Sequence, residues 1–144
     1  MAKLSEYLTT IDGYLNDLGA ILESVRSPGE FTSKPREYYA TLHLLQLSIQ
    51  SLIDMSSRLI SLMGAKKPEE YGDIADILNE EKVLNDGERE TFRSMIKFRS
   101  LLIHVYTKVS PDIVYRIAKE RAERDIKNIA GKILKAALDR GVDP

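Results

Sequence analysis

The chain has 144 residues, no cysteine, and 21 basic against 22 acidic residues, which leave a formal net charge of −1. This length predicts a single domain that can bury a core of its own, and the absence of cysteine excludes disulfides, thiolate metal sites and cysteine nucleophiles. The near-neutral charge argues against broad, nonspecific nucleic-acid binding, so any such contact has to come from a local patch.

The first half of the chain predicts two long helices. Apolar residues recur at three- and four-residue spacing over about Lys3–Val25, and the Ser27-Pro28-Gly29 run stops this helix. After a polar loop, a second helix is expected over about Pro35–Leu62, with Gly64 ending it as a C-cap glycine.

The second helix carries apolar residues on more than one side. Several residues lie off its main stripe: Leu44, Leu47, Ser51, Met55 and Arg58. A helix that is apolar on two sides has to be covered twice, and a second copy of the chain is the simplest cover. We therefore expect a homodimer.

The second half predicts one short helix and two long ones. Pro68 opens a short helix through Leu78, and Asn85 with Glu88 forms a capping box for the next helix. Ser110 followed by Pro111 starts a last helix that runs to about Asp139, before Gly141.

These elements predict an all-α fold over residues 1–144, as a single domain. Four main helices and one additional short helix form an up-and-down bundle. No apolar run approaches the roughly 20 residues that a membrane helix needs, and the N-terminal residues lack the apolar core of a signal peptide. We therefore expect a cytoplasmic protein without a membrane partner.

The helix that follows Asn85 contains three residues that an apolar core helix does not normally carry: Arg99, His104 and Tyr106. Arg99 and Tyr106 fall among its apolar residues, and an arginine there needs a partner or an anion, because an unpaired buried charge is costly. His104 lies about 140° from Arg99 on an ideal helix, on the polar arc with Lys97 and Ser100. Arginine and histidine share a face only if the helix is irregular or if Arg99 reaches round it.

These side chains suit the cleavage of a phosphodiester without a metal ion. Arg99 offers a permanently charged fork that matches phosphate oxygens, and His104 carries an imidazole that can act as general base or acid. Ser100 could hold the substrate or His104, and Tyr106 could contact a base or a phosphate. The other histidine, His43, is far away in sequence, and no carboxylates stand at metal-ligand spacing, so we expect neither a catalytic metal nor a cofactor.

Each residue also has a structural interpretation. Asp54 on the second helix could pair with Arg99, but it could equally pair with Arg58 one turn on. Tyr106 alone would be core packing, and His104 alone would be a solvated histidine.

Three further polar residues are given structural or surface interpretations. His43 has no chemically suited neighbours in the pattern and is interpreted as structural. Arg93 and Lys97 are expected on a solvated face, from which they could also touch an RNA backbone.

The order of arginine, four residues, histidine, one residue and tyrosine resembles the signature of the HEPN superfamily of small helical ribonucleases. More narrowly, the chain resembles HepT-type toxins, whose partners are MNT nucleotidyltransferase antitoxins. The resemblance covers roughly residues 3–135, because further segments come in the family's order: Tyr38–Met63, Pro68–Tyr71, Ile74–Leu84 and Val109–Tyr115. Ser100 stands where the family usually has asparagine, so a polar group is kept but the amide's paired donor and acceptor are lost.

The resemblance implies a metal-independent endoribonuclease, the toxin of a toxin–antitoxin module, whose dimer brings two copies of the motif together across a cleft. It also implies that the nucleotidyltransferase neutralises the toxin by attaching AMP to the motif tyrosine, Tyr106, as O-AMP-tyrosine. Arg99 and His104 would then be catalytic, supported by Ser100, Tyr106, Asp54 and Lys97. The alternative is a catalytically weak helical binding partner of the nucleotidyltransferase, which Ser100 favours and the intact Arg99 and His104 disfavour.

Overall fold

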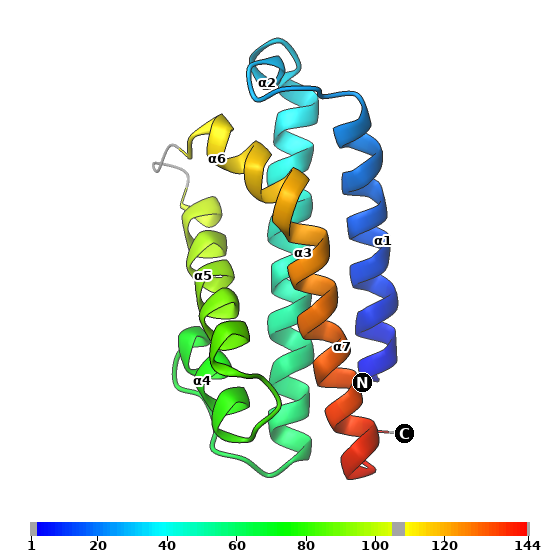
Figure 1. Cartoon of the computed structure of the whole chain (residues 1–144), viewed down its shortest axis with the longest axis vertical. Helices are drawn as coiled ribbons and strands as arrows, with labels where there is room; N and C mark the ends of the chain where they lie inside the picture. Colours follow the sequence, from blue (N-terminus) through cyan, green and yellow to red (C-terminus); the bar gives the residue numbers. More distant parts are fainter. Residues whose placement is uncertain (1–2, 105–108, 144) are drawn as a thin grey trace.

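The computed structural model describes residues 3–104 and 109–143. All secondary structure in this part of the chain is helical, and the helices form a bundle around the long helix α3 (Figure 1). The elements in chain order are α1 (Leu4–Glu23), α2 (Glu30–Ser33), α3 (Pro35–Leu62), α4 (Tyr71–Glu80), α5 (Asp86–Ile103), α6 (Pro111–Arg116), the π-helical turn η1 (Ile117–Ala122) and α7 (Glu123–Arg140). The expected all-α bundle is confirmed. None of these helices is long and apolar enough to cross a membrane.

Helix α3 is the central element because it contacts α1 on one side and α4, α5 and α7 on the others (Figure 1). Its apolar second side is partly covered within the chain: Met55 is fully buried and Leu44 packs against the core, whereas Leu47 is only half-buried. Neighbouring helices of the same chain therefore supply part of the second cover, and the homodimer stays a prediction. The most exposed large apolar side chain of α3 is Tyr39, at 67 % exposure.

Local signals place the ends of several helices as predicted. Asn85 Oδ1 accepts a hydrogen bond from the Glu88 backbone N–H at 2.8 Å, and Glu88 Oε1 accepts one from the Asn85 N–H at 3.0 Å. Gly64 follows α3 in the left-handed region, with φ of +66°. The short helix differs from expectation, because Glu70 caps it and it begins at Tyr71, three residues after Pro68.

Helix α5 ends at Ile103, so the expected placement of the whole motif inside one helix is wrong. His104 is the C-cap residue and has an extended backbone, with φ of −80° and ψ of 102°. The physical reason is that α6 runs in a different direction from α5, so one straight helix cannot contain both (Figure 1). The Tyr38 hydroxyl donates to the Val109 carbonyl at 3.1 Å and so anchors the chain just before α6.

The last helical stretch is continuous, but it is not the uniform α-helix that the sequence predicts. Between α6 and α7 lies the π-helical turn η1, which contributes the buried Ala118 and Ala122 to the core. The loop before α3 also contains an unpredicted element, α2, whose Phe31 is buried against the rings of Tyr38 and Tyr115.

Asp143 joins the two ends of the described chain to α3. Its carboxylate accepts hydrogen bonds from the Leu4 backbone N–H at 2.6 Å and from the Arg58 Nε and Nη2 atoms, both at 3.0 Å. The Arg58 guanidinium, and after it the Leu4 amide, hold the pKa of Asp143 below its ordinary value. The expected alternative of an Asp54–Arg58 pair is therefore wrong. Asp54 instead accepts from the Gln50 side chain at 2.8 Å.

Candidate functional site

Arg99 lies half-buried on the last part of α5, next to the start of α4. Its guanidinium carbon is 5.0 Å from the centre of the Tyr71 ring, a distance at which a cation is attracted to the ring face. Its Nε atom is buried and has no hydrogen-bond partner, and Arg99 makes no ion pair within residues 3–104 and 109–143. The positive charge of Arg99 is thus held by an aromatic ring and not by a carboxylate.

The Tyr71 ring is placed by the cap of α4. Tyr71 is the first residue of this helix, directly after the N-cap Glu70. The Asp73 carboxylate turns back and accepts from the backbone N–H groups of Glu69 at 3.1 Å and Glu70 at 3.0 Å, which anchors the first turn.

Arg93 ties this first turn to α5. Its Nη1 atom donates to the Gly72 carbonyl at 3.1 Å and pairs with an Asp76 oxygen at 2.6 Å. The backbone next to Tyr71 is thereby fixed against the same helix that carries Arg99. Arg93 is exposed as expected, but it acts as a clamp between two helices and is not simply solvated.

His104 leaves the end of α5 on extended backbone and is exposed. His104 keeps a nearly helical φ and leaves the helix only at ψ, so its side chain still lies about 140° from Arg99 around the axis, as on an ideal helix. Five residues of helical rise would separate the two by about 7–8 Å along the axis. Both therefore belong to the same end of α5.

The other candidate residues lie on α5 and α3. Ser100 is half-buried next to Arg99, and Lys97 is exposed one turn earlier. Asp54 is exposed on α3, where its carboxylate accepts a hydrogen bond from Gln50, and no ion pair joins it to Arg99 in the described structure. Tyr106 lies outside the described residues.

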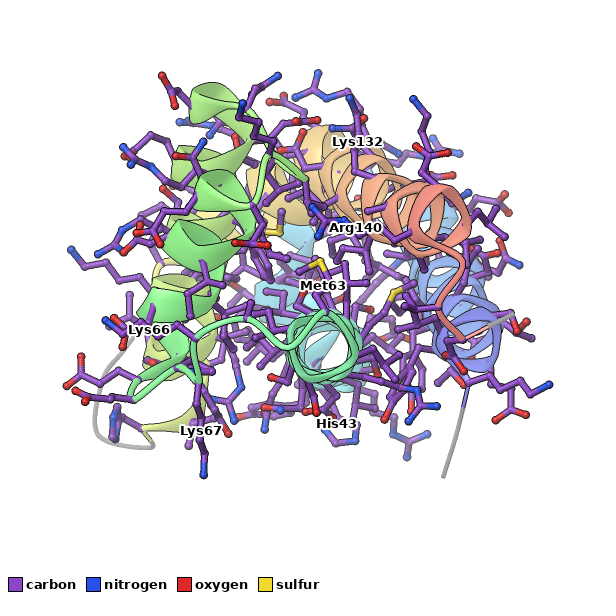
Figure 2. All side chains as sticks on the ribbon, turned by 90° about the horizontal axis from the view of Figure 1, so that it is seen from below. His43, Met63, Lys66, Lys67, Lys132 and Arg140 are labelled. Atoms are coloured by element: carbon purple, nitrogen blue, oxygen red, sulfur yellow. The ribbon has the colours of Figure 1, made fainter. Side chains whose placement is uncertain are left out.

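Additional basic side chains lie near α4 and on the outer side of α3. Figure 2 shows Lys66 and Lys67 on the connection between α3 and α4, and His43 pointing away from α3 on the same side of the bundle as Lys67. All three side chains are exposed. His43 is therefore a surface residue and not part of the core. In the described part of the chain, no three His, Asp or Glu side chains gather as a metal site would require.

A cavity of about 430 Å³ lies on a different side of α5, between this helix and the η1–α7 stretch. Its floor includes Leu45, Ile49 and Phe98, and its mouth includes Ser94 and Arg121. Neither Arg99 nor His104 lines it. The cavity is therefore separate from the candidate site.

The residue that the sequence patterns did not identify is Tyr71. Periodicity and capping signals report contacts within one helix, whereas Tyr71 and Arg99 belong to different helices. The hint in the sequence is an aromatic residue three positions after Pro68, in the first turn of the expected short helix.

Comparison with protein families gives a match over most of the chain. Residues 6–133 match the family described as ribonuclease HepT-like. A protein of Archaeoglobus fulgidus named "Putative RNase" is 24 % identical over 107 residues, which are 74 % of this chain and 80 % of that protein. "Putative RNase YutE" of Bacillus subtilis is 31 % identical over 77 residues, or 54 % of this chain and 51 % of its own length.

Solved structures with the same fold include YutE and two toxin–antitoxin components. YutE of Bacillus subtilis, described as a cytosolic protein of unknown function, has a TM-score of 0.78 at 20 % identity, covering 98 % of this chain and 92 % of its own. A HEPN toxin of Shewanella oneidensis, tri-AMPylated and in complex with an MNT antitoxin, has a TM-score of 0.83 at 16 % identity, covering 94 % and 99 %. A chain from a toxin–antitoxin structure with AMP-PNP has a TM-score of 0.81 at 15 % identity, covering 92 % and 97 %. At these identities the likeness shows the fold.

Proposed function

The chain belongs to the HepT-like family of ribonucleases, and on this premise we propose that it is a metal-independent endoribonuclease, the toxin of a toxin–antitoxin pair. The observation that carries the proposal is the state of Arg99. It is a half-buried cation with a buried Nε atom that lacks a hydrogen bond, and it makes no ion pair in the described structure. A half-buried positive charge of this kind is poorly stabilised unless an anion binds to it. The phosphate of an RNA backbone is a suitable anion.

The proposed reaction uses the 2′-hydroxyl of the RNA as nucleophile. His104 removes its proton while the 2′-oxygen forms a bond to phosphorus and the bond from phosphorus to the 5′-oxygen breaks. The departing 5′-oxygen takes a proton from an imidazolium, and the products are a 2′,3′-cyclic phosphate and a 5′-hydroxyl. Arg99 stabilises the negative charge that builds up on the phosphorane oxygens. Ser100, Asp54 and Lys97 would support the substrate around this centre.

A homodimer would place two copies of this centre across one cleft, so that one His104 acts as base and the other as acid. Exposed apolar side chains beside the site support such an interface. Leu101 and Ile103 are 41 % and 39 % exposed at the end of α5, and Ile113 is 49 % exposed in the first turn of α6. Exposed apolar groups close to a functional residue are typical of surfaces that bind a protein.

We assign the antitoxin role to an MNT-type nucleotidyltransferase that transfers AMP to Tyr106, two residues after His104. The fold shared with the tri-AMPylated Shewanella toxin supports this assignment. A phosphate on the Tyr106 oxygen would compete with the substrate phosphate for Arg99. We place the protein in the cytoplasm, in keeping with the cytosolic YutE.

Cleavage of RNA by the purified chain in excess chelator tests the proposal. His104→Ala should lower the rate about 10²–10⁴-fold, the usual contribution of a general acid–base group, with an unchanged helical circular dichroism spectrum. His43→Ala, which changes the exposed histidine of α3, is the matched control and should cleave like the wild type. Loss of cleavage in chelator with recovery on adding a divalent ion, or wild-type cleavage by His104→Ala, would reject the proposed mechanism.

The alternative function is that of a catalytically weak binding partner of the nucleotidyltransferase. Ser100 favours it, because a serine cannot offer an amide's paired donor and acceptor. Expression without the antitoxin distinguishes the two: an active toxin arrests growth, and a binding partner does not. In the alternative, Ser100→Asn should raise the rate of RNA cleavage.

A further inference from the structure

We propose that Tyr71 is a positioning residue for the reaction, because its ring holds the Arg99 guanidinium where it meets the substrate phosphate. This inference rests on the proposed catalytic role of Arg99. Its basis is the distance of 5.0 Å between the Arg99 guanidinium carbon and the centre of the Tyr71 ring. The two residues come from different helices, so the contact exists only in the folded bundle.

An aromatic ring is a suitable holder for a phosphate-binding arginine. A carboxylate partner would occupy the N–H donors that a phosphate needs, and it would cancel the charge that the transition state uses. A ring face attracts the cation through its electron density and takes none of those donors. In agreement with this, Arg99 has no carboxylate partner among the described residues.

The ring can act as a holder because the backbone that carries it is fixed. Tyr71 begins α4, the Asp73 carboxylate anchors the first turn, and Arg93 binds the adjacent Gly72 carbonyl from α5. The ring is nevertheless 47 % exposed, so a substrate can approach the pair from solvent. An accessible ring on an anchored backbone limits the directions in which the long arginine side chain points.

Three variants test the role of the ring. Tyr71→Phe keeps the ring and removes the hydroxyl, so its cleavage rate should stay within about twofold of the wild type. Tyr71→Leu removes the ring face and should lower kcat about 3- to 30-fold, the range that a cation–π contact of this type supports. KM should change much less, because the negative charge on phosphate is greatest in the transition state. Tyr14→Leu, on α1 at the opposite side of the bundle from α5, is the matched control and should leave both constants unchanged (Figure 1).

A double-mutant cycle ties the effect to Arg99. In an Arg99→Ala background, Tyr71→Leu should cause no further loss, because the group that the ring positions is absent. Independent, additive losses would show that Tyr71 acts on something else and would overturn the proposal.

Nuclear magnetic resonance gives a readout that needs no catalysis. The side-chain protons of Arg99 should be shifted upfield by the ring in the wild type and in Tyr71→Phe, and this shift should vanish in Tyr71→Leu. Absence of the shift in the wild type would overturn the proposal even if the leucine variant does not fold. If Arg99→Ala cleaves RNA normally, the proposed function is wrong. If Arg99→Ala is inactive but Tyr71→Leu cleaves like the wild type, only the positioning role is wrong.

Discussion

Replacing Arg99 by alanine should separate activity from stability. If Arg99 binds a substrate phosphate, Arg99→Ala should lower the rate of RNA cleavage about 10²–10³-fold while the fold stays as stable as the wild type or becomes more stable. If Arg99 were a structural residue, its removal would destabilise the fold. The two interpretations therefore predict different signs for the change in the free energy of unfolding.

The magnitude follows from the surroundings of Arg99. The substitution loses the contact with the half-exposed Tyr71 ring, worth about 0.5–1 kcal/mol. It also removes a buried Nε atom without a hydrogen bond, and such a group costs about 1–3 kcal/mol. The net change is a stabilisation of roughly 0–2 kcal/mol. Breaking a buried ion pair would instead cost about 3–5 kcal/mol.

Thermal unfolding followed by circular dichroism measures this difference. For a chain of this size, 1 kcal/mol corresponds to about 3 °C in Tm, so the Tm of Arg99→Ala should stay unchanged or rise by up to about 6 °C. Its rate of RNA cleavage should fall about 10²–10³-fold, as for other groups that stabilise transition-state charge. Arg58→Ala is the contrasting control: it removes the partner of Asp143, so it should lower Tm and leave cleavage intact. A fall of about 10 °C or more in Arg99→Ala would refute the reasoning, because it would mean that Arg99 is a structural ion-pair residue.

Three further predictions concern acid stability, assembly and modification. Arg58, and after it the Leu4 amide, hold the pKa of Asp143 below its ordinary value of about 4. The stabilisation that the Asp143 carboxylate gives to the fold is therefore present above about pH 4, and it is lost as the pH falls through the folded-state pKa. Tm should therefore fall more steeply below about pH 4 in the wild type than in Asp143→Asn. Asparagine is chosen because it tolerates the φ of +50° at this position. Parallel acid profiles of the two proteins would contradict this prediction. In sedimentation equilibrium at micromolar concentration the chain should be a dimer, and a monomer would remove the composite cleft. Incubation with the nucleotidyltransferase, ATP and magnesium should add AMP to Tyr106 and suppress cleavage, and Tyr106→Phe should resist this; adenylate mapped by mass spectrometry to Tyr71 or Tyr115 would show that the switch lies elsewhere.

The sequence by itself determined the helices and many of their ends. The start of α3 at Pro35, the capping box of Asn85 and Glu88 and the left-handed Gly64 were all predictable, because each depends on residues within about four positions of one another. The arrangement of arginine, histidine and tyrosine also pointed to the family that the comparison with known proteins shows.

Only the tertiary structure decided how these elements meet. The end of α5 at Ile103 goes with the different direction of α6, which helical periodicity does not report. The pairing of Arg58 with Asp143 instead of Asp54 joins positions 85 residues apart. The contact between Arg99 and Tyr71 depends likewise on how α4 packs on α5. Periodicity and caps are local properties of a chain, whereas the partner of a charged side chain is set by which helices become neighbours.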